Sequence, residues 1–190
     1  MQRASILGVL GILSVLARPA DAGSDAGAPG NNVLPPIGHT FFCMRYPDDC
    51  APTTGRTIPN VPAELPLLKS INETVNSTIV PTTDEAPVVN QRWLIEPVIG
   101  DCNDYAVTKR HKLLEAGWPA SSLLLAEVTL ISTGEHHLIL IVRGKTADWV
   151  LDNRMSAVVK LAETRNQYIL DRVESTEDPR FWTRSLAPTW

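Results

Sequence analysis

Apolar side chains recur every three or four residues between residues 63 and 79. This spacing predicts a helix with one buried side, formed by Leu65, Leu68, Val75 and Ile79. Asn72 and Asn76, within the same stretch, are expected on its solvated face. Proline-rich stretches at residues 51–62 and 81–97 flank the helix and are typical of connecting segments.

A second helix is predicted from Cys102 to about Ala116. Asp101 is a residue type that caps helix N-termini, and Gly117 ends the pattern with a proline soon after it. Cys102 therefore lies in the first turn, where unpaired backbone N–H groups and the helix dipole favour an anion. Placement there is one known way to lower the pKa of a thiol and make it a nucleophile. His111 is expected to be solvent-exposed, on the charged face formed by residues 109–112.

After Pro119 the pattern changes to short apolar runs rich in branched side chains, which predict strands. The clearest runs are residues 123–131, 137–143 and 148–151, and shorter ones at 157–161 and 168–170 extend the sheet. Glycine-containing turns separate the first three runs and are typical of hairpins. Helices followed by an antiparallel meander predict an α+β fold.

The N-terminus has the features of an export signal: a positive start, an apolar run at residues 6–16 and small residues at 20–22. The apolar run is shorter than the roughly 20 residues that span a membrane. We expect a signal peptide at residues 1–22, a flexible leader at 23–38 and one folded domain at 39–190. The mature protein is then periplasmic or secreted, with no transmembrane span.

The length of the chain and its net charge restrict the classes of protein to which it can belong. The chain has 190 residues, of which 44% are hydrophobic and 20% charged, and this suits one globular domain. The formal net charge is -4. Because phosphate binding requires a basic surface, this charge argues against nucleic acid as the main partner.

Three cysteines fit an oxidising compartment. Cys43 and Cys50 are close in sequence, and we interpret them as a disulfide, which would stabilise the fold by roughly 2.5 kcal/mol. A metal site is the alternative, but no histidine or further cysteine nearby supplies the other ligands. This pairing leaves Cys102 as the third, unpaired cysteine. It then forms an intermolecular disulfide, is an inert buried thiol or is a reactive thiol.

Two candidate partners for a reactive Cys102 come from neighbouring predicted strands. His137 opens one strand and Asp152 closes the next, so a hairpin between them would place both at one edge of the sheet. A thiol nucleophile needs a base, and the base needs a third group that orients its ring. His136 points to the opposite strand face, and spacing alone leaves both histidines open.

The segments that carry this chemistry resemble a known family. Residues 100–106 (GDCNDYA), 137–140 (HLIL) and 150–153 (VLDN) are similar to motifs of the bacterial transglutaminase-like cysteine proteinases. This family includes LapG-like periplasmic cysteine peptidases, which clip large adhesins from the cell surface. The resemblance covers about residues 41–168, and separations of 35 (102 to 137) and 15 (137 to 152) make it specific.

The resemblance implies a papain-like/transglutaminase-like domain, with a nucleophile helix packed on an antiparallel sheet. It assigns Cys102 as the nucleophile and His137 as the general base and acid. Asp152 is then the residue that orients the imidazole. It also favours His137 over His136, because the family histidine is followed directly by the apolar strand.

The resemblance also bears on cofactors and partners. No cofactor is required by this chemistry, but LapG-like members bind calcium beside the nucleophile, for which Asp101 and Asp104 are the candidates here. Asn103 stands where the family has glutamate, and the loss of a carboxylate weakens the attraction for a hard cation. An inner-membrane regulatory receptor is the partner that the resemblance implies.

Three functions follow as hypotheses. The first is an exported cysteine peptidase that cleaves a protein substrate, such as a surface adhesin, through a thioester acyl-enzyme. Attack of an amine on the same thioester would instead make a transglutaminase, and the sequence does not separate the two because both share the nucleophile. The third is a catalytically idle envelope module that binds a protein partner, and the presence of all three triad residues counts against it.

Overall fold

The computed structural model describes residues 32–53, 59–82 and 92–184. The expected signal peptide at residues 1–22, and the expected leader as far as residue 31, therefore lie outside the described residues. Within the described part, no helix is both long and apolar enough to cross a membrane.

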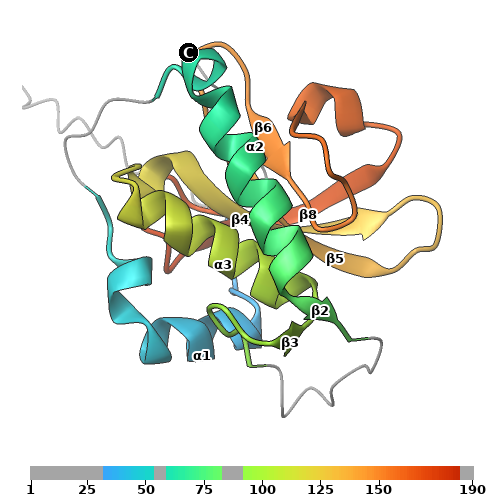
Figure 1. The fold of residues 1–190 in the computed structure, drawn as a ribbon. Helices are drawn as coiled ribbons and strands as arrows, with labels where there is room; N and C mark the ends of the chain where they lie inside the picture. Colours follow the sequence, from blue (N-terminus) through green and yellow to red (C-terminus); the bar gives the residue numbers. More distant parts are fainter. Residues whose placement is uncertain (1–31, 54–58, 83–91, 185–190) are drawn as a thin grey trace, which may run out of the picture.

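A seven-stranded antiparallel sheet forms the centre of the fold, with the strand order β1-β9-β8-β4-β5-β6-β7 (Figure 1). Its strands are β1 (Asn32–Val33), β4 (Leu123–Leu130), β5 (His136–Val142), β6 (Trp149–Leu151), β7 (Val159–Lys160), β8 (Tyr168–Glu174) and β9 (Trp182–Thr183). A separate parallel pair, β2 (Val80–Pro81) and β3 (Ile99–Gly100), comes just before the second predicted helix.

The helices are α1 (Ile37–Arg45), α2 (Val61–Thr78) and α3 (Cys102–Glu115), with short 3-10 turns η1 (Pro47–Cys50), η3 (Ala120–Ser122) and η4 (Leu161–Thr164). Helices α2 and α3 cross one face of the sheet (Figure 1). On that face Leu125 and Leu140 join the helices in the main core, whereas Leu124 and Ile141 form a smaller core on the other face. Burial on both faces explains the continuous apolar runs, because side chains alternate along a strand. The expected α+β fold is confirmed.

Strands β5 and β6 pair in the expected register, with Leu140 opposite Leu151 and Val142 opposite Trp149. Strand β8, in contrast, pairs with β4 instead of continuing the sheet beyond β7, so the sheet is not a simple meander. This pairing brings Tyr168 to the end of the sheet where His137 lies, with ring centroids 6.5 Å apart.

Regular structure begins before the expected domain boundary at residue 39. Strand β1 pairs with β9, and α1 starts at Ile37. Gly38 lies so close to Trp93 that a Cβ there would be 2.4 Å from the indole Nε1. Residues 32–38 are therefore part of the folded domain and not of a leader, because distant parts of the chain hold them.

The charged run at residues 109–112 is not the solvent-exposed face that the sequence predicts. Lys109 and Arg110 are 1% and 0% exposed, and His111 is only half-exposed, with Nδ1 3.0 Å from Asp49 Oδ1. The reason is that α2 and η1 both pack against α3, so this helix has little free surface.

Arg110 lies at the centre of a buried polar cluster. Its Nε donates to the Leu123 carbonyl oxygen at 3.0 Å and lies 3.5 Å from Glu174 Oε2, and its Nη1 donates to the Asp49 carbonyl oxygen. Glu174 Oε1 in turn lies 2.9 Å from His39 Nε2. The cluster ties α1, η1, α3, β4 and β8 together.

Candidate active site

Cys102 is the first residue of α3, as the sequence predicts. Asp101 caps the helix by accepting the Asn103 backbone N–H at 2.9 Å, and Asp104 Oδ2 accepts the Asp101 backbone N–H at 3.0 Å. Gly100 is required before this cap, because a Cβ there would lie 2.6 Å from Asp104 Oδ2. The two aspartates therefore fix the backbone turn that presents the thiol.

His137 and Asp152 meet at the end of the β5–β6 pair, where the predicted hairpin places them. His137 Nε2 lies 2.8 Å from Asp152 Oδ1, and the two residues are 6% and 1% exposed. Burial by itself raises the pKa of Asp152, but the hydrogen bond and charge of His137 hold that pKa below its usual value. His136 instead points to solvent near Asp171, so His137 is the histidine that faces the carboxylate.

Asp152 is held by further groups that the sequence did not reveal. The Tyr168 hydroxyl donates to Asp152 Oδ2, and the Arg154 backbone N–H donates to Oδ1 at 2.9 Å. From α2, Asn76 Nδ2 donates to the Asp152 carbonyl oxygen at 3.1 Å, and Asn72 is fully buried against the same loop. The expectation that both asparagines lie on a solvated face is wrong, because they fasten this loop to α2.

The Cys102 thiol is free and partly buried. Burial raises the pKa of Cys102 to about 12, and the charges of Asp101 and Asp152 act in the same direction, opposed by the backbone N–H of Leu138. Among the residues that the structure describes, no hydrogen bond joins the thiol to the His137 ring. Burial thus outweighs the backbone N–H groups, including that of Cys102 itself at the helix start, which lower the pKa of this thiol.

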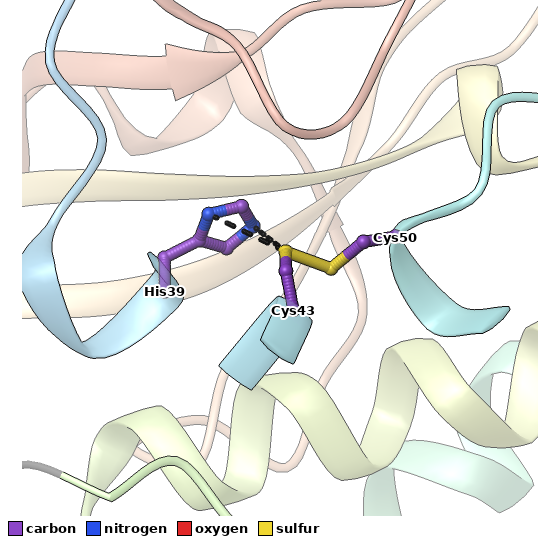
Figure 2. Close-up of side chains that lie close together, drawn as sticks. All are labelled: His39, Cys43 and Cys50. Atoms are coloured by element: carbon purple, nitrogen blue, oxygen red, sulfur yellow. Dashed lines mark hydrogen bonds between the residues drawn. A yellow bond between two sulfur atoms is a disulfide. The ribbon is translucent and has the colours of Figure 1, made fainter. Parts of the chain in front are cut away.

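One group of potential metal ligands occurs in the described part of the chain. His39, Cys43 and Cys50 place their ligand atoms within 4.8 Å of one another, and Figure 2 shows the His39 ring beside the Cys43 sulfur, with Nε2 at 3.5 Å. The two sulfurs form the disulfide expected from the sequence, so neither is a thiolate that binds metal. The expectation that no histidine lies nearby is wrong, because α1 places His39 one turn before Cys43.

The calcium candidates Asp101 and Asp104 lie together at the start of α3, but most of their oxygens already accept hydrogen bonds. Both oxygens of Asp104 accept backbone N–H groups, from Leu94 at 2.7 Å and from Asp101 at 3.0 Å. Burial also raises the pKa of Asp104 to about 6. Calcium takes roughly six to eight oxygen ligands, and the described residues at this helix start do not supply a fitting set.

Comparison with known proteins places the chain in a family. The family described as bacterial transglutaminase-like cysteine proteinase BTLCP matches residues 29–188 of the chain. That span covers most of the sequence and includes Cys102, His137 and Asp152. No curated protein matches the chain by sequence.

Solved structures of LapG from Legionella pneumophila are similar to the fold. One is 20% identical and covers 61% of this chain and 65% of its own, with a TM-score of 0.50. An EGTA-treated form is 19% identical and covers 63% and 66%, with a TM-score of 0.51. A calcium-bound form is 20% identical and covers 56% and 62%, with a TM-score of 0.48. The chain thus matches less than two thirds of the LapG chains, and at this identity the likeness shows the shared fold.

Proposed function

The chain belongs to the bacterial transglutaminase-like cysteine proteinases, and we propose that it is an exported peptidase that cleaves a protein substrate with a triad of Cys102, His137 and Asp152. The observation that carries the proposal is the buried 2.8 Å hydrogen bond between His137 and Asp152, at the sheet edge beside the start of α3. A thiol, an imidazole and a carboxylate that orients the ring are the parts that covalent catalysis by cysteine requires.

His137 acts as the general base in this proposal. Asp152 accepts a hydrogen bond from the Nε2–H group, which fixes the tautomer and leaves Nδ1 to take the Cys102 proton. Because burial raises the pKa of the thiol, we place proton transfer to the imidazole together with attack on the substrate. A well-placed base of this kind contributes about 10²- to 10⁴-fold to the rate.

The chemical steps follow from these roles. The Cys102 sulfur attacks the scissile carbonyl carbon, and backbone N–H groups at the start of α3 stabilise the resulting oxyanion. When the tetrahedral species collapses, the C–N bond breaks, His137 gives its proton to the leaving amine, and a thioester remains. His137 then deprotonates a water molecule, which hydrolyses the thioester and restores the thiol.

The cellular setting rests on the sequence. The signal at residues 1–22 would deliver the mature chain to the periplasm or the exterior, and the folded domain at 39–190 would take in residues 32–38 as well. The resemblance to LapG-like peptidases favours a surface adhesin as substrate and an inner-membrane receptor as regulator. Asp101 and Asp104 would bind calcium at most weakly, because their oxygens already accept backbone N–H groups, and no step above depends on the ion.

Paired variants of the two neighbouring histidines test the triad. With casein or an adhesin fragment as substrate, Cys102→Ala and His137→Ala should each lower kcat by about 10⁴-fold. His136→Ala, the matched control, should stay within about twofold of wild type, because surface changes away from the site have small effects. Circular dichroism checks that all three variants are folded.

Each other outcome has a distinct meaning. Cleavage retained by Cys102→Ala would contradict the proposed triad. Incorporation of a labelled amine into protein, at the expense of hydrolysis, would instead identify a transglutaminase. Absence of both reactions, together with a Cys102 that no thiol-reactive peptide labels at neutral pH, would identify a binding module.

A further inference from the structure

Asp152 begins a loop that has no regular structure of its own. It is the first residue after β6, and the pairing of that strand with β5 ends one residue earlier, at Leu151. The Arg154 backbone N–H donates to Asp152 Oδ1 at 2.9 Å, and the Met155 backbone N–H donates to the Asp152 carbonyl oxygen at 3.4 Å. Both bonds lie within the loop and move with it, so they do not fix Asp152 relative to the rest of the molecule.

Helix α2 supplies bonds from outside the loop. Asn76 Nδ2 donates to the carbonyl oxygens of Asp152 at 3.1 Å and of Met155 at 3.2 Å. Asn72, one turn earlier on the helix, donates to those of Met155 at 2.9 Å and of Ser156 at 3.1 Å. Each amide thus uses its N–H groups on the same loop, and of the two it is Asn76 that reaches Asp152.

The amide oxygens show which part of each asparagine the fold uses. Asn72 Oδ1 and Asn76 Oδ1 are buried and have no hydrogen-bond partner in the part of the chain that the structure describes. A buried polar atom without a partner is costly. Both asparagines therefore act through their N–H groups, which offset that cost by pairing the carbonyl oxygens of the loop.

We propose that Asn76 is a positioning residue of the triad: its amide fastens the Asp152 backbone to α2 and so holds the carboxylate where it orients the His137 ring. The inference rests on the proposed function, because that ring is the base of the proposed reaction. His137 does not provide this anchor, since its ring is the group to be oriented. The Tyr168 hydroxyl holds the carboxylate from β8, and Asn76 holds the same residue from α2. Asp152 is thereby fixed between the sheet and a helix.

Alanine variants of the two asparagines, made in the full chain, separate positioning from stability. Asn76→Ala should lower kcat on casein by about 10- to 100-fold, because misplacing a catalytic group by about 1 Å can cost about 10²-fold. Its KM should stay within about twofold of wild type, since the amide makes no contact that binds substrate.

Asn72→Ala is the matched control. It loses N–H bonds to the same loop, and Asn72 is the more buried of the two residues, so its Tm should fall at least as far. Its kcat should nevertheless stay within about threefold of wild type, because its amide bonds Met155 and Ser156 instead of Asp152. Equal losses of kcat in the two variants would overturn the proposal, since both amides would then only stabilise the loop.

Nuclear magnetic resonance gives a second measurement that needs no protein substrate. The chemical shifts of the imidazole nitrogens report which nitrogen carries the proton, and the His137 signals are assigned by their loss in His137→Ala. We expect the Nε2–H form in wild type and in Asn72→Ala, but both tautomers in Asn76→Ala, because a displaced carboxylate no longer selects Nε2–H. His39, whose Nε2 lies 2.9 Å from Glu174 Oε1, is the internal reference and should keep one tautomer throughout. A pure Nε2–H form in Asn76→Ala would overturn the proposal.

The two measurements separate this inference from the proposed function. Both tautomers of His137 in Asn76→Ala, in a chain whose wild type cleaves no protein, would refute the proposed peptidase but not the anchoring of Asp152. Cleavage by the wild type, with kcat and tautomer unchanged in Asn76→Ala, would refute the anchoring alone. If Asn76→Ala does not fold, the same comparison is made with Asn76→Ser, whose shorter side chain carries no amide.

Discussion

Lys109 and Arg110 are consecutive buried basic residues on α3, and the described part of the fold provides hydrogen-bond partners for only one of them. Arg110 uses two of its nitrogens, which donate to carbonyl oxygens of Leu123 and Asp49, and it lies 3.5 Å from the Glu174 carboxylate. Lys109 is buried to a similar extent, yet its Nζ has no hydrogen-bond partner among the described residues. The Arg110 charge therefore has partners in several elements of the fold, whereas the Lys109 amine has none among the described residues.

The difference shows that two equally buried basic side chains can be satisfied to very different extents. Glu174 also accepts the backbone N–H of Leu125 at 2.8 Å and lies 2.9 Å from His39 Nε2, so the charge of Arg110 belongs to a well-connected network. Such a network is rigid and fixes its members in one state. The Lys109 amine lacks such a network, and burial lowers its pKa to about 7.

Breaking the structural cluster should have the largest effect on stability. Glu174→Gln keeps the side-chain size but removes the charge opposite Arg110, which leaves a buried cation uncompensated. We expect the free energy of unfolding to fall by about 3–5 kcal/mol in urea denaturation near neutral pH. Glu127→Gln, in a half-exposed pair with Arg172, is the control and should lower it by about 1 kcal/mol or less. Equal losses in the two variants would contradict a structural role for the Arg110 cluster.

The buried amine of Lys109 predicts that the free energy of unfolding depends on pH. Burial lowers the pKa of Lys109 to about 7, from 10.5 for an ordinary lysine. Between these values the unfolded chain binds a proton that the folded chain does not, so the free energy of unfolding should rise with pH. We expect a rise of about 2–3 kcal/mol from about pH 7 to pH 9 that is absent in Lys109→Met. Lys112→Met should keep it, and equal slopes in all three proteins would contradict the burial of a neutral amine.

The sequence predicts the parts of this arrangement that depend on local pattern. The limits of α3 follow from the cap at Asp101 and the stop at Gly117. The meeting of His137 with Asp152 follows from a short hairpin, because one turn fixes the register of its two strands. Local periodicity and turn chemistry are sufficient for both.

The parts that the sequence does not predict depend on distant partners. Helix α1 is held through His39, which bonds Glu174 across 135 residues, and this contact leaves no periodic signal. Tyr168 reaches Asp152 only because β8 crosses to the free edge of β4. Lys109 and Arg110 read as a charged surface run, because lysine and arginine are seldom fully buried. Tertiary packing overrides that tendency here.

Removal of the Tyr168 hydroxyl should have a smaller effect, confined to the triad. Tyr168→Phe takes one hydrogen bond from Asp152, which keeps those from His137 and the Arg154 backbone. We expect kcat/KM to fall by about tenfold, because a hydrogen bond to a charged group is worth about 1.5–3 kcal/mol. Tyr46→Phe, at the end of α1, loses the same hydroxyl and should stay near wild type. An unchanged kcat/KM in Tyr168→Phe would mean that the remaining bonds suffice to hold Asp152.

Calcium should have the smallest effect. Asp104 already accepts two backbone N–H groups and Asp101 accepts one, and Asn103 adds no charge. We expect a dissociation constant for calcium that is larger than about 1 mM. At about 1 mM calcium, the free energy of unfolding should therefore exceed its value in EGTA by less than about 0.5 kcal/mol. Asn103→Glu adds a third carboxylate beside the thiol and should create a calcium-dependent rise in Tm. A large calcium-dependent rise in the Tm of the wild-type chain would instead show that Asp101 and Asp104 give up their capping hydrogen bonds to bind the ion. The start of α3, which carries the thiol, would then have two alternative conformations.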